Sequence, residues 1–549
     1  MDFDQLNARL PEGTSDFKDI ISSNCVYVDK TQYIYGLALK KGQYFLSRPR
    51  RFGKSTLIST FEELFSHGVK PYDGHESYFK GLYIEDKWTD EKEYLIMKLD
   101  FAELFSDYCN TGNDFEIRFI QVLNEFAEQF GIAPKENAKV SDAFSNILKN
   151  VNNQSLVILI DEYDFPLTQN INRPEVFEGI VKVLRTFYQC MKSNSGKYRF
   201  VFITGITRYK DTAIFTAGNT IKDISMIQRY GQILGYTRDE IKQFFPDHLR
   251  YSASVRFKKE MENVSDSDIE SLLDTLATMY DGYCFDENIE THVFSTWSII
   301  SFFGDDLASL KNYWYENGGG LPSILKNYLT SIKSQSLELL KSNQIAVDKN
   351  TFLNPSNLDS MDVRVLLCQT GYLTFKDKNE ENFYLKFPNQ EIISSFKTLY
   401  FINCYTDNLQ RDALKACKIE NLATSKDIVS YFNRILNAVD YEHYPLTQES
   451  AITNSLFMFF NGYGVTYTNV NVHSAKGRAD LIIDDGHRRI VCELKYAKES
   501  DNAESLLKEA CEQIATREYG DTEPKPQELL KLALVFSEKD RKFTLYKEC

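Results

Sequence analysis

The sequence predicts an α/β protein with a parallel sheet in its N-terminal part, a mainly helical middle and a small second α/β domain at its C-terminal end. Two apolar runs, SLVILID (155–161) and RFVFITG (199–205), show no alternation of apolar and polar residues and are separated by helical patterns. Such runs are typical of parallel strands buried on both faces of a sheet. The pattern changes near residue 235, where helical spacing begins to dominate, and near residue 440, where short strand-like and helical stretches alternate. A chain of 549 residues is too long for one hydrophobic core, so several domains are expected.

The elements of the N-terminal sheet follow from the spacing of its apolar residues. Residues 43–47 (QYFLS) predict a short buried strand, which a basic loop connects to a helix over 55–66. A second strand is predicted over 94–100 and a helix over 115–130, ahead of the two long apolar runs. We expect this domain to span residues 1–235.

The rest of the chain is divided by a helix start and by a return of strand-like segments. Thr237 and Glu240 have the spacing of a capping box, which marks a helix start. Helical patterns then continue to about residue 435, with a break at the glycines 318–320 and a possible short strand pair around 371–387. We expect a helical lid and middle region over 236–435 and a separate domain over 436–549. Within that last domain the pattern predicts helices over 449–461 and 502–519 and strands over 463–472, 479–484, 489–495 and 531–536.

Composition and charge restrict the class of protein. The formal net charge of -15 argues against a protein that coats nucleic acid with its whole surface, although one basic patch suffices for phosphate binding. The ten cysteines form no CxxC pair, so neither a zinc site nor a disulfide framework is expected. The N-terminal residues lack the basic and apolar regions of a secretory signal, and no apolar run has the length of a membrane span. We therefore expect a reduced, soluble, cytoplasmic protein without a membrane partner.

The segment RPRRFGKST (48–56) lies between the first predicted strand and its helix, which is the setting of a phosphate-binding loop. In this interpretation Gly53 lets the backbone approach a nucleotide, Lys54 reaches its β- and γ-phosphates, and Ser55 binds Mg²⁺ at the positive end of the helix. Arg48 departs from the usual pattern, which has a glycine at this place. The alternative is a basic surface loop. The predicted ATP-binding residues here are Arg51, Phe52, Gly53, Lys54, Ser55 and Thr56.

Polar residues that end the next two apolar runs complete the predicted nucleotide site. Asp161 and Glu162 follow a buried strand, as a Walker B segment requires; Asp161 would hold the Mg²⁺ shell and Glu162 would activate the attacking water. Alone, such an acid pair is more often a cap for the next element, but the preceding phosphate-loop motif favours the catalytic role. Arg208, just beyond the run at 199–205, is a candidate sensor or finger, although a loop arginine is an ordinary feature.

Several segments together resemble the predicted AAA-ATPase family. They are YVDKT (27–31), SRPRRFGKSTL (47–57), LIDEYDFPL (159–167), TGITRYKDTAIF (204–215), GYTRDEI (235–241) and YDGYCF (280–285). The resemblance covers about residues 8–310 and includes the arginine at position 48. It implies a P-loop NTPase sheet with a helical lid and ATP and Mg²⁺ binding at Lys54, Ser55, Asp161 and Glu162. Where the family tends to have Asn-Pro-x-Ser, this chain has FSTWS (294–298), so the lid is expected to differ in detail.

A second set of carboxylates lies in the C-terminal domain. GRAD (477–480) ends in Asp480, and the following strand pattern carries Glu493 and Lys495 two residues apart, which places both on one face of a strand. Two carboxylates suit Mg²⁺, and Lys495 would position or help to deprotonate the attacking water. The alternative is an exposed strand pair with ordinary charges, because Glu-x-Lys is frequent on surface strands.

This pattern resembles the PD-(D/E)XK nuclease superfamily over about residues 440–549. Glu449 begins a helix at the place of that family's upstream acidic residue, and Gln513-Ile514 stands where the family often has a Gln-Ile pair. The resemblance implies a small restriction-endonuclease-like α/β domain with catalytic Asp480, Glu493 and Lys495. It implies Mg²⁺ binding by Asp480 and Glu493, with Glu449 and Gln513 in support.

These observations favour an ATPase coupled to a Mg²⁺-dependent nuclease that acts on nucleic acid, with DNA favoured over RNA. The alternative is a nucleotide-operated switch or sensor whose nuclease-fold domain binds a partner without cleaving it. A P-loop kinase for a small molecule would leave the last domain without a role. A homo-oligomer is compatible with the AAA resemblance. No HExxH or GxSxG motif supports zinc or serine hydrolysis, and Trp297 and Trp314 are interpreted as packing residues of the middle region.

Overall fold

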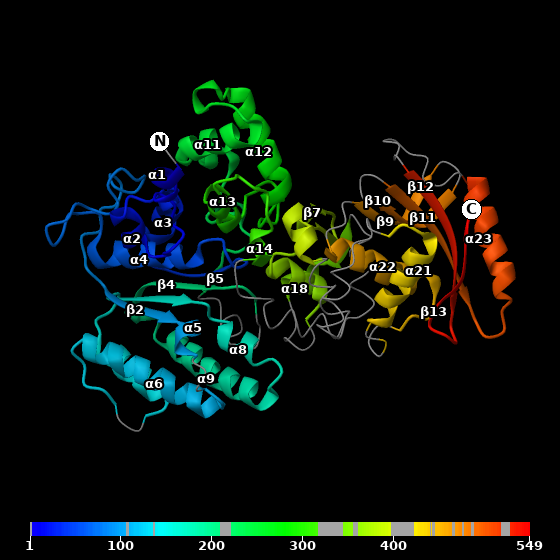
Figure 1. Ribbon diagram of the computed structural model, residues 1–549. Helices are drawn as coiled ribbons and strands as arrows, with labels where there is room; N and C mark the ends of the chain where they lie inside the picture. Colours follow the sequence, from blue (N-terminus) through cyan, green and yellow to red (C-terminus); the bar gives the residue numbers. More distant parts are fainter. Residues whose placement is uncertain are drawn as a thin grey trace. The chain divides into compact units, whose positions relative to one another are not determined.

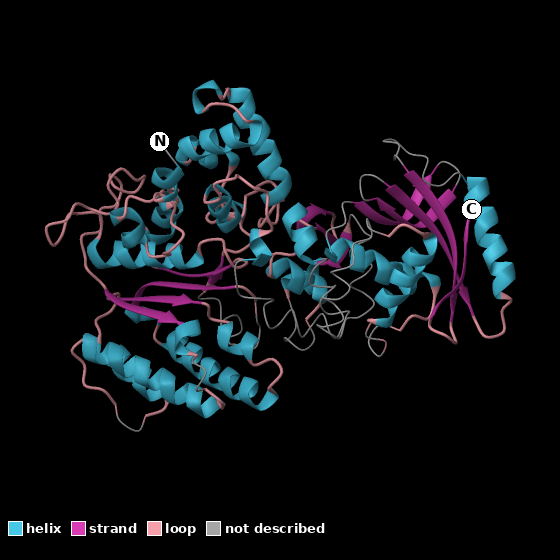
Figure 2. Ribbon diagram, in the orientation of Figure 1, coloured by secondary structure: helices cyan, strands magenta, loops and turns pink. Residues whose placement is uncertain are grey.

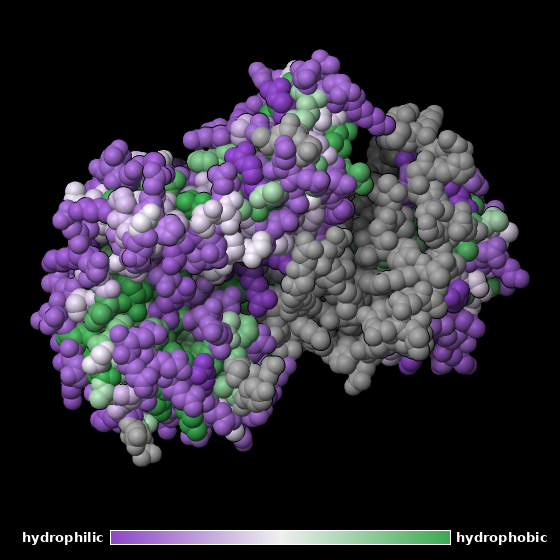
Figure 3. All heavy atoms as spheres, turned by 60° about the vertical axis from the view of Figure 1, so that its left-hand side comes forward, coloured by the Kyte–Doolittle hydropathy of each residue, from purple (hydrophilic) through white to green (hydrophobic). Residues whose placement is uncertain are grey.

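The computed structural model divides into two compact units, which Figures 1 and 2 show as ribbons. The first unit holds the described residues up to 316 together with 344–393, and the second holds those from 394 onward. On the face shown in Figure 3, hydrophilic residues cover most of the described surface. No described helix combines the length and apolar character needed to cross a membrane. The described residues are 3–105, 109–135, 138–208, 221–316, 344–354, 361–396, 422–439, 441, 445–463, 467–474, 477–484, 488–517 and 528–549, so the predicted break at 318–320 lies outside them.

A five-stranded parallel sheet forms the centre of the first unit, in the order β2-β3-β4-β1-β5. Every residue of β3 and β4 is buried, which confirms the prediction made from the two unbroken apolar runs. Ser47 aligns with Gly205 and Asp100 with Asp161, so the carboxyl ends of four strands meet at one edge. The strands are β1 (Gly42–Ser47), β2 (Leu95–Asp100), β3 (Leu156–Asp161), β4 (Tyr198–Gly205) and β5 (Lys222–Asp223).

Helices cover both faces of this sheet. Figure 1 shows α4 on one side and α6 and α9 on the other, and α7 packs against α6 and α9. The apolar faces of α6 and α9 bury phenylalanines against each other, with Phe119 and Phe187 at 4.9 Å between ring centroids. The helices are α1 (Phe3–Asn7), α2 (Phe17–Ser22), α3 (Thr31–Ala38), α4 (Lys54–His67), α5 (Phe101–Leu104), α6 (Gly112–Gln129), α7 (Val140–Asn150), α8 (Phe165–Gln169) and α9 (Pro174–Ser193), with a 3-10 turn η1 at Ser195–Lys197.

A group of lid helices follows the sheet and shares a hydrophobic core with the N-terminal segment. Thr237 and Glu240 form the predicted capping box at the start of α10. The core of the lid also includes Leu10, Val26 and Val28, so the beginning of the chain packs against the lid. The lid elements are η2 (Gln228–Tyr230), α10 (Arg238–Phe244), α11 (Pro246–Phe257), η3 (Met261–Asn263), α12 (Asp266–Tyr280), α13 (Thr296–Phe303) and α14 (Tyr313–Glu316).

The first unit ends in a small antiparallel sheet, which we name the β6–β8 subdomain (residues 344–393). Its strand order is β6-β8-β7. The hairpin of β7 and β8 confirms the strand pair predicted within the middle region, whereas β6 was not predicted. The elements are β6 (Ile345–Asp348), α17 (Lys349–Leu353), α18 (Val363–Gln369), β7 (Thr374–Lys378) and β8 (Asn382–Lys386).

The second unit is a mixed sheet between helices, in the order β13-β12-β11-β10-β9, with only β11 and β12 parallel. One face packs in a large core with α21 and α22, and the other carries a smaller apolar cluster under α23. This arrangement confirms the predicted C-terminal α/β fold. The elements are α21 (Ser425–Asn437), α22 (Glu449–Tyr463), β9 (Tyr467–Ser474), β10 (Gly477–Asp484), β11 (Arg488–Ala497), α23 (Ala503–Arg517), β12 (Glu528–Ser537) and β13 (Lys542–Glu548).

A disulfide between Cys511 and Cys549 corrects one expectation from the sequence. The absence of CxxC pairs predicted no disulfide, but these cysteines are 38 residues apart in the chain and meet through the fold. Cys511 lies on α23, and Cys549 follows β13, with its backbone N–H bonded to the Lys531 carbonyl on β12. Cysteine spacing alone cannot show a contact that depends on how a helix packs over a sheet.

Candidate functional site

The loop between β1 and α4 is the candidate phosphate-binding loop. Gly53 caps α4 with a φ of 90°, in the left-handed region that glycine adopts without strain. Phe52 is buried and packs edge-on against Tyr283, at 4.9 Å between centroids. Lys54 begins α4 and is also buried; its ammonium donates to the carbonyls of Arg48 and Pro49 at 3.2 and 2.9 Å. Burial lowers the pKa of Lys54, while the charges of Asp161 and Glu162 act in the opposite direction.

Arg48, at the place of the usual first glycine, is buried beside the loop. Its guanidinium donates to the carbonyl of Ser225 at 2.7 Å and to that of Tyr230 at 2.9 Å, and it lies 4.4 Å from the ring centroid of Phe285. Burial lowers the pKa of Arg48 to about 9. The Arg48 side chain therefore connects the end of β1 to the segment that contains Ser225 and Tyr230, and in this way it supports the loop.

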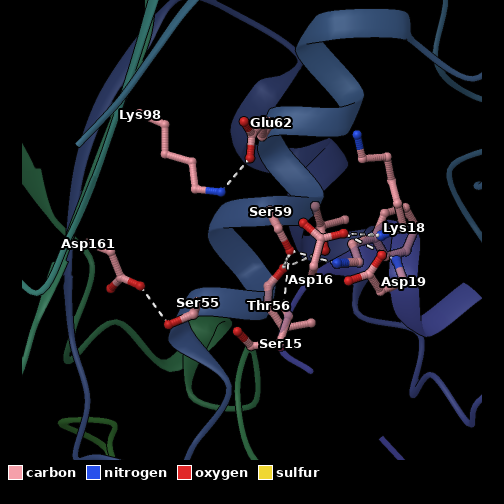
Figure 4. Close-up of polar contacts among 12 residues, drawn as sticks. Ser15, Asp16, Lys18, Asp19, Ser55, Thr56, Ser59, Glu62, Lys98 and Asp161 are labelled. Carbon is pink, nitrogen blue, oxygen red and sulfur yellow. Dashed lines mark hydrogen bonds and ion pairs between the residues drawn. The ribbon is translucent and has the colours of Figure 1, made fainter. Parts of the chain in front are cut away.

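Ser55 and Asp161 meet at the carboxyl edge of the sheet, as Figure 4 shows. The Ser55 hydroxyl donates to the Asp161 carboxylate at 2.6 Å. The other carboxylate oxygen of Asp161 accepts from the Thr204 hydroxyl and from the backbone N–H of Glu162. The parallel register of β3 and β4 brings these groups together although they are far apart in the sequence. A hydroxyl and a carboxylate are hard oxygen ligands, so this pair fits Mg²⁺.

Glu162 directly follows β3 and has a positive φ of 48°, which is uncommon for a residue other than glycine. Burial raises the pKa of its carboxyl group, and the nearby Lys54 opposes that rise. Among the described residues, no side chain or backbone group donates a hydrogen bond to this carboxylate. The strained backbone and the accessible acceptor fit a group that contacts a substrate water.

Arg208 lies at the same edge but is engaged elsewhere. Its guanidinium pairs with Asp223 at 2.7 Å, and its backbone N–H donates to the side chain of Gln369 at 3.2 Å. Asp164, which the sequence interpretation did not single out, is buried and accepts from the backbone and hydroxyl of Thr207. Asp164 thus organises the segment that carries Arg208.

A cavity of about 350 Å³ lies beside the phosphate loop, and Asp161 is not one of its lining residues. One wall is the segment 11–15, which Ser59 of α4 holds in place: its hydroxyl accepts from the backbone of Phe17 at 2.9 Å and contacts the Ser15 carbonyl at 3.2 Å (Figure 4). The sequence interpretation missed this cavity because its walls come from five separate segments. The lining includes Arg51, Phe52, Gly53 and Thr56 of the loop, residues 233–236, Thr296 and Trp297.

The predicted carboxylates of the second unit lie on adjacent strands. Leu481 pairs with Cys492, so the neighbouring Asp480 and Glu493 end up side by side. The Asp480 carboxylate accepts from the backbone N–H of Leu494 at 2.8 Å. The Lys495 ammonium lies 4.0 Å from the Glu493 carboxylate, and the side chains of both residues are almost fully buried.

Comparison with known proteins assigns both parts of the chain. Residues 11–215 match the family described as predicted AAA-ATPase, and residues 447–544 match the PD-(D/E)XK nuclease superfamily. The chain joins a predicted AAA-ATPase region to a PD-(D/E)XK nuclease superfamily domain. It is also 26% identical over 395 residues to an "Uncharacterized protein in vnfD 5'region" of Azotobacter chroococcum mcd 1, an alignment that covers 70% of this chain and 69% of the relative.

Helix α23 of the PD-(D/E)XK domain adds an acidic residue that was not predicted. The Lys495 ammonium lies 3.7 Å from the carboxylate of Glu509, which in turn accepts from the Gln513 side chain at 3.2 Å. Glu509 lies one helical turn before Gln513, and this spacing was the available sequence signal. Lys495 is thus placed between a buried and an exposed carboxylate.

Glu449 joins this site from the start of α22. Its carboxylate accepts from the backbone N–H of Tyr496 at 3.3 Å, and burial raises its pKa while the Lys495 charge lowers it. Within the described ranges, no group of three or more His, Cys, Asp or Glu side chains is close enough to hold a metal ion. The PD-(D/E)XK site therefore offers the two neighbouring carboxylates Asp480 and Glu493, which fit Mg²⁺ as a pair of oxygen ligands.

Proposed function

We propose that the chain binds and hydrolyses ATP in its AAA-ATPase region and that its PD-(D/E)XK domain cleaves nucleic acid in a Mg²⁺-dependent reaction. The contact between Ser55 and Asp161, directly beside Lys54 and Glu162, carries the first part of this proposal. These are the side chains that nucleoside-triphosphate hydrolysis requires at the end of a strand and at the start of a helix.

Each part of the nucleotide site has a role in this proposal. The cavity beside Gly53 accepts the base and sugar, and the loop amides with the start of α4 receive the phosphates. Lys54 exchanges its two carbonyl partners for phosphate oxygens. Glu162 accepts a proton from the attacking water, for which its raised pKa is suited. Mg²⁺ held by Ser55 and Asp161 would neutralise charge on the phosphates.

In the nuclease domain, three neighbouring side chains supply the chemistry. Asp480 and Glu493 would hold Mg²⁺, which stabilises the negative charge that develops on the phosphodiester. Lys495 orients the attacking water and stabilises the same charge by its ammonium group. Its position between the carboxylates of Glu493 and Glu509 directs that ammonium group.

A nucleotide-operated switch without cleavage is the second candidate. It is favoured by the absence, within the described residues, of a metal-holding group of three acids, and by the backbone hydrogen bond that already engages Asp480. DNA rather than RNA as substrate, a homo-oligomer, a cytoplasmic location and the boundaries at 235 and 435 stay predictions.

The test is incubation of the full chain with DNA and with RNA, each with and without ATP and Mg²⁺. Lys54→Ala is expected to abolish ATP hydrolysis, and Lys40→Ala, at an exposed lysine just before β1, is the control. Asp480→Ala is expected to abolish cleavage, with Glu499→Ala at an exposed acid as its control. ATP hydrolysis without any Mg²⁺-dependent cleavage would select the switch, and full cleavage by Asp480→Ala would refute the metal site.

A further inference from the structure

Arg51 of the phosphate loop is held in a strained backbone conformation. Its φ of 69° lies in the left-handed region, where a residue with a side chain is destabilised by roughly 1–2 kcal/mol. Such a conformation persists only where the surrounding structure imposes it. The contacts of Arg51 therefore show what imposes the shape of the loop.

The Arg51 side chain is fixed from the lid. Its guanidinium donates to the carbonyls of Tyr313 and Trp314, at 2.5 and 2.6 Å. The Arg51 carbonyl accepts from the backbone N–H of Trp297 at 3.3 Å, and the guanidinium lies 5.9 Å from the ring centroid of Trp297. Both tryptophans that the sequence suggested were packing residues thus contact the phosphate loop.

Glu391 connects these lid contacts to the β6–β8 subdomain. Its side chain is fully buried and accepts from the backbone N–H of Trp314 and from the Ser298 hydroxyl, both at 2.8 Å. Burial raises the pKa of Glu391 to about 7, and the charge of Arg51 counteracts that rise. A buried carboxylate therefore holds the turn whose carbonyls hold Arg51.

The same subdomain touches the loop at a second point. Gly371 has a φ of 88°, and a Cβ atom there would lie 2.8 Å from the ring of Pro49. The neighbouring Gln369 accepts from the backbone of Arg208. The β6–β8 subdomain thus packs against the beginning of the loop as well as holding Arg51.

We infer that Glu391 is a positioning residue for nucleotide binding, which acts through Arg51 and makes the β6–β8 subdomain part of the nucleotide site. This inference rests on the proposed function. The Glu391 carboxylate orders the turn at Tyr313 and Trp314, this turn holds the Arg51 guanidinium, and the loop amides from Arg51 to Lys54 keep the shape that receives phosphate. Loss of the hydrogen bonds to Glu391 allows Arg51 to leave its left-handed conformation, and the loop then binds phosphate more weakly.

The experiment is a double-mutant cycle in the full chain, with ATP affinity measured by calorimetry. Glu391→Gln is expected to raise the Kd for ATP roughly tenfold, equivalent to about 1.4 kcal/mol, and Arg51→Ala to do the same. In the Arg51→Ala background, Glu391→Gln should have no further effect. Ser298→Ala removes one hydrogen bond to Glu391 and is the milder variant if Glu391→Gln folds poorly. Glu380→Gln, at an exposed residue of the same subdomain, is the control.

Tryptophan fluorescence gives a readout without nucleotide, because two of the three tryptophans contact Arg51. Glu391→Gln should shift the emission of the nucleotide-free protein, and Glu380→Gln should not. Additive effects on the Kd, or an unchanged emission and an unchanged Kd, would overturn the role of Glu391 while leaving ATP binding intact. A wild-type chain that binds no ATP would overturn the proposed function and this inference together.

Discussion

Two buried cations lie in the candidate phosphate-binding segment. Arg48 and Lys54 are both buried, and each donates to backbone carbonyls of the loop or of the segment beside it. A charge without partners in the interior costs several kcal/mol, so these cations persist because carbonyl groups surround them. Arg48 donates to carbonyls of the segment beside the loop, whereas in the proposed function Lys54 exchanges two carbonyls for phosphate oxygens. The proposed roles of the two residues therefore differ: Arg48 supports the loop and Lys54 binds the ligand.

Glu162→Gln is expected to separate hydrolysis from binding. The substitution keeps the size of the side chain and removes the group that accepts a proton, so kcat for ATP hydrolysis should fall by roughly 10²–10⁴. The Kd for ATP should stay within about threefold, because the phosphates are held by the loop and Lys54. Single-turnover hydrolysis and equilibrium binding measure the two quantities. Near-normal hydrolysis by Glu162→Gln would assign the proton transfer to another group.

Glu391 is expected to make stability depend on pH near neutrality. Its pKa is raised to about 7 in the folded protein, mainly by burial, with Arg51, Tyr280 and Tyr283 as the ionisable groups around it. In the folded protein Glu391 keeps its proton up to about pH 7, whereas in the unfolded chain it releases this proton near pH 4.5. The stabilisation that comes from the bound proton is therefore complete below pH 4.5 and is lost as the pH rises through 7. Between pH 5 and pH 8 the wild type should lose up to about 3 kcal/mol more unfolding free energy than Glu391→Gln.

Denaturant unfolding at both pH values measures this difference, and Glu380→Gln, which leaves the buried carboxyl in place, should follow the wild type. Parallel pH profiles for the wild type and Glu391→Gln would show that the Glu391 proton is not linked to folding.

At the scale of elements, α23 closes one face of the second sheet and presents Glu509 to Lys495. The apolar cluster beneath it is small, with Ile482, Val491, Ala510, Ile514 and Ala533 as its buried members. The disulfide from Cys511 to Cys549 adds a covalent link between this helix and the end of the sheet. The link therefore supplements a weak hydrophobic contact next to the candidate nuclease site.

Reduction of this disulfide is expected to destabilise the second unit. Closing a loop of this length removes chain entropy equivalent to about 4 kcal/mol in the unfolded state, which is the upper limit of the expected loss. Thermal unfolding with and without a thiol reductant measures the effect. Cys511→Ser should lower the unfolding temperature and abolish its dependence on reductant, whereas Cys25→Ser, at a free cysteine of the other unit, should keep that dependence. An unfolding temperature insensitive to reductant would contradict a formed disulfide.

The elements that the sequence predicted are those in which a local pattern and the fold agree. The strands β3 and β4 are long, apolar and buried on both faces, so their composition alone identified them. Helical patterns were predicted between these two runs, where α9 lies, although no bounds were given for that helix; β5 has only two residues, too few to show a periodic pattern. The candidate nucleotide residues Asp161 and Glu162 were predicted because they end such a strand, whereas Asp480, Glu493 and Lys495 were predicted from their spacing on two strand-like segments. Glu391 and the cavity were not predicted, because burial and contacts between segments far apart in the sequence leave no local pattern.

At the scale of the whole molecule, the two units have separate hydrophobic cores and separate candidate sites. The candidate nucleotide site lies in the first unit, between the sheet, the lid and the β6–β8 subdomain. The nuclease-type site and the disulfide lie in the second unit. Since each unit buries its own core, each is expected to unfold as its own cooperative transition.

ATP is therefore expected to stabilise one of two transitions. A ligand at a hundred times its Kd stabilises the state that binds it by about 2.7 kcal/mol, and this gain belongs to the unit that contains the loop. Calorimetry of the full chain should show one transition that ATP moves to higher temperature and one that responds to reductant. Lys54→Ala should remove the ATP shift and keep the reductant response, and Cys511→Ser should do the opposite. A single transition that both agents move would mean that the units unfold together, and nucleotide binding would then stabilise the nuclease-type domain directly.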